Sequence, residues 1–111
     1  RDTAYMALAA RRVETIDKTR DYLINARMHL LYAKTYQFTE RDPKRARQEI
    51  GRAEEHINGA MSAADATTRK QLSEVTAELR KLESEAGSRD DSIKNGYSNI
   101  NESLTRLIHN R

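Results

Sequence analysis

The sequence predicts an all-α protein, an antiparallel up-down-up-down four-helix bundle with a long first helix. Apolar residues return every three or four positions along nearly all of the 111 residues, which is the spacing that lines one face of a helix. The chain has a single Pro and only four Gly, so few positions interrupt a helix. We expect residues 1–111 to form one helical-bundle domain. Because the chain starts at Arg1 without an initiator Met, we interpret it as a fragment of a larger or processed protein.

The first helix is expected over residues 3–40, with Asp2 or Thr3 as its N-cap. Its apolar stripe consists of Ile16, Thr19, Leu23, Ala26, Leu30 and Ala33. Asp42-Pro43 ends the helix, because the residue before a proline is pushed out of the α region. Pro43 itself suits the first position of the next helix, so a tight antiparallel hairpin is expected to follow.

The second helix is expected over residues 43–65. Large and small residues alternate along its buried stripe, which contains Ala46, Ile50, Ala53, Ile57, Ala60 and Ala64. Small side chains allow a neighbouring backbone to come close. Gly51 and Gly59 favour the same interpretation, although a helical Gly costs roughly 1 kcal/mol relative to Ala.

The stretch 63–71 leaves two architectures open. It contains no Gly or Pro, which allows a continuous helix over 43–86 and a three-helix bundle. Thr68 and Gln71 have the spacing of a capping box, which favours a turn and four helices. The first helix also favours the turn, because its C-terminal half carries a second stripe that needs a second neighbour. This second stripe comprises Ile24, Met28, Leu31, Thr35 and Phe38.

The third and fourth helices are expected over residues 68–86 and 90–109. The third carries the most regular heptad of the chain, formed by Thr68, Leu72, Val75, Leu79, Leu82 and Ala86. Gly87-Ser88 stops this helix, and Asp90 and Asp91 are expected to cap the next. The fourth helix is expected to bury Ile93, Tyr97, Ile100, Leu104 and Leu107.

The first helix is longer than its companions, so about residues 1–14 are expected to project beyond the bundle. This tip is apolar, and Tyr5, Met6 and Leu8 form a possible association segment. It could continue from a stalk or from a membrane anchor upstream of Arg1, or it could pair two copies as a homodimer. The alternative is that the tip folds back onto the last helix.

Motifs for several common chemistries are missing from the sequence. The chain has no Cys, no Glu-x-x-His pair, no His-Glu-x-x-His and no glycine-rich phosphate loop, so we expect no enzyme activity, no cofactor and no metal site. The three histidines, His29, His56 and His109, lie off the main apolar stripes and are expected to have ordinary surface roles. Haem held between Met6 and His109 is disfavoured, because neither residue continues an inward-facing series.

Charge is mixed along the chain. Twenty Lys and Arg face seventeen Asp and Glu, a net charge of +3, and the two signs alternate. The basic residues of the Arg41–Arg52 tip are offset by nearby carboxylates, so nucleic-acid binding there is not favoured. No apolar run approaches the ~20 residues that a membrane-spanning helix needs. The missing Cys is consistent with a periplasmic or other extracytoplasmic location, which we favour over the cytoplasm.

Aromatic residues gather on the first helix, where Tyr22, His29, Tyr32, Tyr36 and Phe38 form a possible partner surface. Aromatic rings offer a large contact area at low entropic cost. The alternative is that the Tyr hydroxyls simply emerge at the edge of the core.

The functional hypothesis is a non-enzymatic interaction or sensing module, an extracytoplasmic part of a bacterial envelope protein that acts through helix-mediated protein contacts. A small sliding of the first helix against the Ala-rich second helix could carry a signal. The alternative is a cytoplasmic adaptor or dimerisation domain, which could touch nucleic acid through the Arg41–Arg52 tip.

Overall fold

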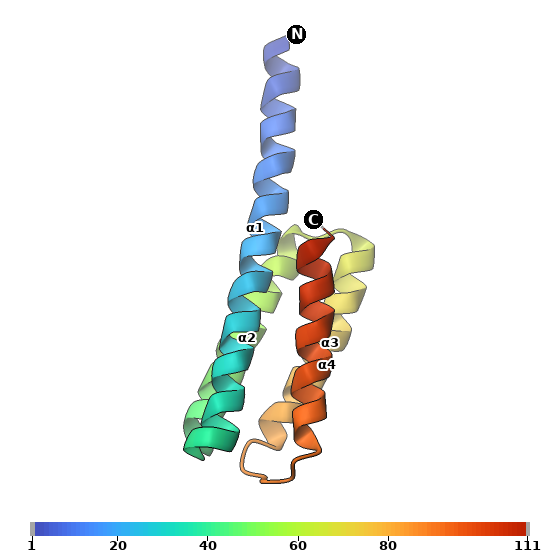
Figure 1. Cartoon of the computed structure of the whole chain (residues 1–111). Coiled ribbons are helices and arrows are strands. Elements are labelled where there is room, and N and C mark those ends of the chain that lie inside the picture. The colour runs from blue at the N-terminus through green and yellow to red at the C-terminus, as the bar shows by residue number, and fades with distance from the viewer. Residues whose placement is uncertain (1, 111) are drawn as a thin grey trace.

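The computed structural model is a four-helix bundle in which successive helices run up, down, up and down (Figure 1). It describes the backbone of residues 2–110 and the side chains of residues 18–110. The elements are α1 (Asp2–Thr35), a π-helical turn (Tyr36–Glu40), α2 (Pro43–Ala63), α3 (Ala66–Ser84) and α4 (Ile93–His109). The four-helix prediction is therefore confirmed, and the three-helix alternative with a continuous helix over 43–86 is excluded.

The core is built from the stripes that the periodicity predicts. Each helix turns its main stripe inward, except at Ala64, which is only half-buried because α2 ends at Ala63 and not at residue 65. Ile16 is the one predicted stripe residue outside the described side chains. The fully buried core side chains include Leu23, Leu30, Ile50, Ile57, Leu72, Leu79, Ile100 and Leu104. Alanines of α1 and α2 lie among them, namely Ala26, Ala33, Ala46, Ala53 and Ala60. The hydrophobic effect on these stripes supplies the main driving force for assembly.

The first hairpin differs from the prediction at its tip. The regular α-helix ends at Thr35, not at residue 40, and Tyr36–Glu40 form the wider π turn. The Asp42 N–H then donates to the Tyr36 carbonyl at 2.8 Å, while Arg41 adopts a left-handed conformation with φ 54°. Asp42 caps α2 by accepting from the Arg45 N–H at 3.2 Å, and Pro43 occupies the first turn as expected.

The π turn places Gln37 inside the bundle, where it joins three segments. Its Nε2 donates to the carbonyls of Glu85 at 2.8 Å and Ser88 at 3.2 Å, and its Oε1 accepts from the Tyr97 hydroxyl at 2.6 Å. Gln37 is only 4% exposed. Because a buried amide is costly unless hydrogen-bonded, this network holds the α3–α4 loop against the end of α1.

The other two junctions differ, because an aspartate caps α3, whereas α4 has Ser92 at its N-cap and no side-chain cap hydrogen bond, so the predicted capping by Asp90 and Asp91 is wrong. Asp65, not Thr68, caps α3, since its carboxylate accepts from the Thr68 N–H at 2.8 Å, and α3 therefore begins two residues earlier than predicted. Between α3 and α4 the Asp90 carboxylate accepts from the Ser92 N–H at 2.9 Å. Asp90 and Asp91 thus belong to a turn, and α4 starts at Ile93 and not at residue 90. The α-helix of α3 likewise ends at Ser84, two residues before the predicted end.

The predicted second stripe of α1 is only partly correct. Ile24 and Phe38 pack against the core, but Met28 and Leu31 are 38% and 47% exposed, and Thr35 is exposed as well. The fourth helix meets α1 along a different line, where Arg27 Nη1 donates to Thr105 Oγ1 of α4 at 3.3 Å. The first helix therefore has two neighbours, as expected, but the predicted stripe is covered only in part, at Ile24 and at Phe38, whose ring meets Tyr97 of α4.

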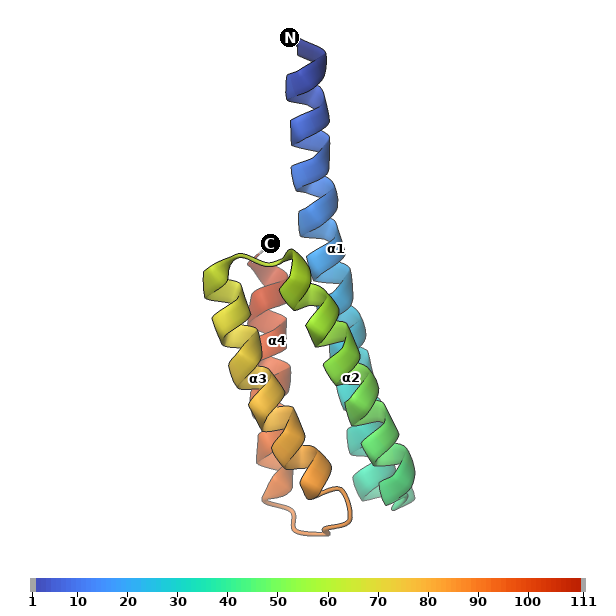
Figure 2. The ribbon, with the colours of Figure 1, turned by 180° about the vertical axis from the view of Figure 1, so that it is seen from behind.

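The N-terminal part of α1 extends past the α2–α3 turn and past the C-terminal end of α4, as both views of the ribbon show (Figures 1 and 2). We refer to residues 2–17 of α1 as the N-terminal arm. The molecule measures 60 Å along its long axis and about 20 Å across, with extents of 21 and 18 Å. Among the described residues, no helix has the length and apolar character that a membrane crossing requires.

Two glycines of α2 should respond in opposite ways to the same substitution. A Cβ on Gly51 would have no neighbour within 4 Å, so Gly51→Ala should raise the free energy of unfolding by about 0.5–1 kcal/mol through helix propensity. A Cβ on Gly59 would lie 2.5 Å from Tyr22 Cε1, so Gly59→Ala should lower it by roughly 1–2 kcal/mol. Urea titration of both variants tests this. Equal stabilisation by both would show that Tyr22 does not pack on Gly59.

Glu54 should destabilise the bundle at neutral pH. Burial, and then the hydrogen bond and charge of Glu83, raise the pKa of Glu54 above 4.5. The folded protein holds this proton more tightly than the unfolded chain, so the free energy of unfolding falls as the pH rises through 4.5 and the folded pKa. Glu54→Gln should therefore raise the Tm at pH 7 and flatten its pH dependence between pH 4 and 7. The matched control is Glu55→Gln, at the next and exposed position, which should change neither.

Candidate functional site

The structure divides the predicted partner surface of α1 into separate groups. Tyr22, His29 and Tyr36 line the side of α1 that faces α2, where Tyr36 lies beneath the Arg45 guanidinium at 5.7 Å. Tyr32 is exposed and contacts only His29 of its own helix among the described aromatic rings. Phe38 faces the opposite side. Its ring meets Tyr97 of α4 edge-on at 6.0 Å, and Lys94 Nζ lies 5.0 Å from its centroid. The five residues therefore do not form one continuous aromatic surface.

A buried ion-pair network joins α1 to α2. His29 Nδ1 donates to Glu49 Oε2 at 2.6 Å, and Arg52 Nη1 donates to Glu49 Oε1 at 2.7 Å. The side chains of His29 and Glu49 are 14% and 9% exposed. Each carboxylate oxygen thus has its own donor, which offsets the cost of burying the charge.

His29 and His56 lie in the seam between α1 and α2, contrary to the prediction that all three histidines have ordinary surface roles. The ring of His56 stacks on that of His29, with centroids 5.2 Å apart and planes 8° apart. Tyr22 closes the other side of His56 with a centroid distance of 6.4 Å and packs in the space left by Gly59. Only His109 has the exposed position that the sequence analysis expects for all three.

The seam is arranged for packing and not for coordination. Lone pairs of an imidazole lie in the ring plane, so two stacked rings direct theirs along parallel planes and not toward one ion. Glu49 is already engaged by His29 and Arg52. Within the part of the chain that the structure describes, no three His, Asp or Glu residues are grouped to hold a metal.

An apolar strip lies on the outward side of α1. Met28, Leu31 and Tyr32 are the large hydrophobic side chains that the described residues expose, and Tyr32 is 48% exposed. The three side chains are neighbours on the helix by spacing, at positions i, i+3 and i+4. The strip is the exposed remainder of the predicted second stripe together with Tyr32, whose ring edge contacts His29 at 6.0 Å.

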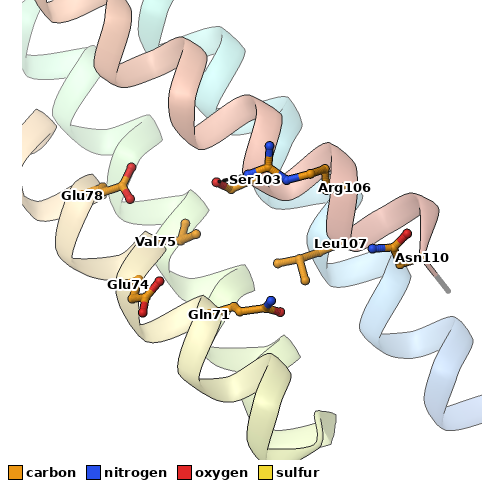
Figure 3. Close-up of a pocket in the computed structure, with 8 residues that line it drawn as sticks. All are labelled: Gln71, Glu74, Val75, Glu78, Ser103, Arg106, Leu107 and Asn110. Carbon is orange, nitrogen blue, oxygen red and sulfur yellow. Dashed lines mark hydrogen bonds between the residues drawn. The ribbon is translucent and has the colours of Figure 1, made fainter.

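A groove runs along the outer side of the seam between α3 and α4. It consists of two cavities of about 320 and 290 Å³ that share Glu78. Figure 3 shows the first, where Val75 and Leu107 form an apolar floor between Glu74 and Glu78 of α3 and Arg106 of α4. The second continues toward the α3–α4 loop, past Lys81. We refer to both cavities together as the α3–α4 groove.

The remaining predicted sites have different outcomes. The association segment Tyr5, Met6 and Leu8 lies outside the described side chains. The basic tip is divided, because Arg45 pairs with Asp42 at 3.6 Å and Arg52 is bound to Glu49, whereas Arg41 borders a small cavity of about 120 Å³ with Arg89 and Lys94.

Glu49 is the residue of this seam that sequence reasoning missed. It precedes Ile50 and lies three positions after Ala46, so it stands at the edge of the α2 stripe and could be taken for a solvated glutamate. Its partner is twenty positions away on α1. Glu49 and His29 come together only because of the way α1 and α2 are rotated about their own axes where they pack.

In comparisons with protein families, curated proteins and solved structures, none matches this chain.

The His29–Glu49 contact should be energetically coupled. A double-mutant cycle with His29→Ala and Glu49→Ala should give a coupling free energy of roughly 1–3 kcal/mol, because both groups are largely buried. The matched control is the exposed pair Lys94 and Asp91, joined at 3.3 Å, for which about 0.5 kcal/mol or less is expected. Urea denaturation at pH 7 measures both cycles. Equal coupling in the two would mean that the His29 contact does not hold α1 against α2.

Proposed function

We propose that this chain is a non-enzymatic helical-bundle module that acts through helix-mediated protein contacts, with α1 as the contacting element. The observation that carries the proposal is the N-terminal arm, which continues α1 beyond the bundle (Figure 1). An isolated helix of this length is marginal in water. A partner surface beside the arm would supply the packing that such a helix lacks.

The polar groups of the bundle support a non-enzymatic role. His29, Glu49 and Arg52 satisfy one another, and Gln37 and Tyr97 bind each other inside the core. A catalytic acid or base must be able to reach a substrate proton. These side chains are instead directed at neighbouring helices, where they stabilise the packing.

The exposed strip of α1 supports the choice of this helix. Met28, Leu31 and Tyr32 place apolar area on the same element that forms the arm. Contiguous exposed apolar area marks interaction sites more often than isolated exposed residues do. The arm and the strip together would let a partner follow α1 along much of its length.

The setting that we propose is the extracytoplasmic side of a bacterial envelope, where the module would sense or relay by a shift of α1. A chain without Cys is compatible with such a compartment. Fractionation of cells that carry the parent protein, with an antibody to this bundle, tests the location. Recovery in the cytosolic fraction alone would contradict it and leave the contact role of α1 untouched.

Removal of the arm should change the association of the protein. We expect the full chain to self-associate, because the arm is apolar in sequence, and a chain that starts at Glu14 to be a folded monomer. Light scattering gives the mass of each form, and circular dichroism checks its helices. Identical masses at all concentrations would contradict the proposal that the arm makes protein contacts.

A further inference from the structure

We infer that Asn95 is a site of spontaneous covalent modification, at which the main-chain nitrogen of Gly96 displaces the side-chain amide as ammonia. The chain contains two Asn-Gly pairs, Asn58-Gly59 and Asn95-Gly96. A glycine after an asparagine has no Cβ beside the attacking nitrogen, so these pairs are the least hindered settings for this reaction. The structure favours one pair over the other, independently of the contact role of α1.

The two pairs are matched in their exposure to solvent. Asn58 and Asn95 are both exposed, and the glycine after each is half-buried. Access of water therefore does not distinguish them. Their positions along the helices differ, since Asn58 lies inside α2, which continues to Ala63, and Asn95 lies in the first turn of α4, which begins at Ile93.

The first turn of α4 has a different hydrogen-bond pattern from the first turns of α2 and α3. In those two helices the N-cap carbonyl accepts from the N–H four positions ahead, as Asp65 does from Arg69 at 2.9 Å. In α4 the Ser92 carbonyl accepts from Asn95, three positions ahead, at 3.1 Å, and the Ser92 side chain makes no cap hydrogen bond. Hydrogen bonds of this shorter type have poorer geometry, so the turn around Asn95 opens more easily than a capped helix.

This difference matters because the reaction needs the main chain of the asparagine to leave its helical conformation. The new ring contains the Cα, Cβ, Cγ and carbonyl carbon of Asn95 and the nitrogen of Gly96. At the end of a helix this rotation disrupts few hydrogen bonds. At Asn58 it would break the α2 hydrogen bonds on both sides and move Gly59, on which the Tyr22 ring packs.

The reaction proceeds in two steps. The Gly96 nitrogen loses its proton and attacks Cγ of Asn95. A C–N bond forms, the bond from Cγ to the side-chain nitrogen breaks, and ammonia leaves with the proton. Water then adds to one of the two carbonyl carbons of the succinimide ring and opens it to an aspartate or an isoaspartate. Gly96 borders the α3–α4 groove, through which water reaches the ring.

The two products affect the loop end of the bundle differently. Both add a negative charge to the first turn of α4, where the helix dipole favours it. The isoaspartate also inserts a methylene into the main chain between Ile93 and Tyr97, whose buried side chains lie one turn apart. Tyr97 donates to Gln37 at 2.6 Å, and this contact depends on the position of α4. The isoaspartyl form should therefore have a lower Tm than the aspartyl form.

Peptide mass spectrometry of the protein after incubation at pH 8 and 37 °C tests the inference. Conversion at each pair appears as the loss of one ammonia and the gain of one water. We expect Asn95 to convert at least about tenfold faster than Asn58 in the folded protein. In urea, where no helix protects either pair, the two rates should agree within about threefold. Equal rates in the folded protein, a faster rate at Asn58, or no conversion at Asn95 while the unfolded chain converts would each overturn the inference.

A substitution of Asp90 provides a second measurement, because its carboxylate accepts from the Ser92 N–H at 2.9 Å and holds the turn before α4. Asp90→Ala should raise the rate at Asn95 at least about threefold and leave the rate at Asn58 unchanged. The matched control is Asp65→Ala, which removes the carboxylate at the start of α3 and should leave the rate at Asn95 unchanged. Equal acceleration of both pairs by Asp90→Ala would show that the reaction requires global unfolding, and the inference would be wrong.

Discussion

Close packing of α1 on α2 is the contact on which the rest of the bundle depends. It is the most extensive contact between elements, and both helices contribute fully buried alanines, among them Ala26 and Ala53. Small side chains bring the backbones near enough for His29 to reach Glu49 and for Tyr22 to pack on Gly59. Both contacts require one register of the hairpin. The remaining helices then close over a pair whose relative position is already specified.

This seam changes how a signal could pass through the module. The alanines by themselves suggest that α1 slides along α2 at little cost, which is the expectation from sequence. A shift by one residue, about 1.5 Å, would break the 2.6 Å hydrogen bond between His29 and Glu49. It would also move the Tyr22 ring off Gly59. The seam therefore favours discrete positions of α1 over gradual sliding, and a rigid α1 would transmit any displacement of the arm.

The two ends of the bundle have different characters. At the loop end, Gln37 ties the π turn to Tyr97 and to the carbonyls of the α3–α4 loop, so this end is closed by buried hydrogen bonds. At the opposite end, α1 continues outward past the α2–α3 turn and the C-terminal end of α4. The arm, which is the proposed contacting part of α1, therefore projects from the end opposite to the one that Gln37 closes.

Helix count, order and buried faces were predictable from the sequence. Periodicity selects the face of each helix that avoids water, as for Leu72 and Leu79, and Asp42-Pro43 marks a boundary by backbone sterics alone. Periodicity says nothing about the angle at which two stripes meet. That angle covers Ile24 but leaves Met28 exposed, and it pairs His29 with a glutamate twenty residues away. Tertiary structure decides these contacts, because a residue at the edge of a stripe becomes buried only if a neighbouring helix packs over it, and the sequence pattern does not specify where that helix lies.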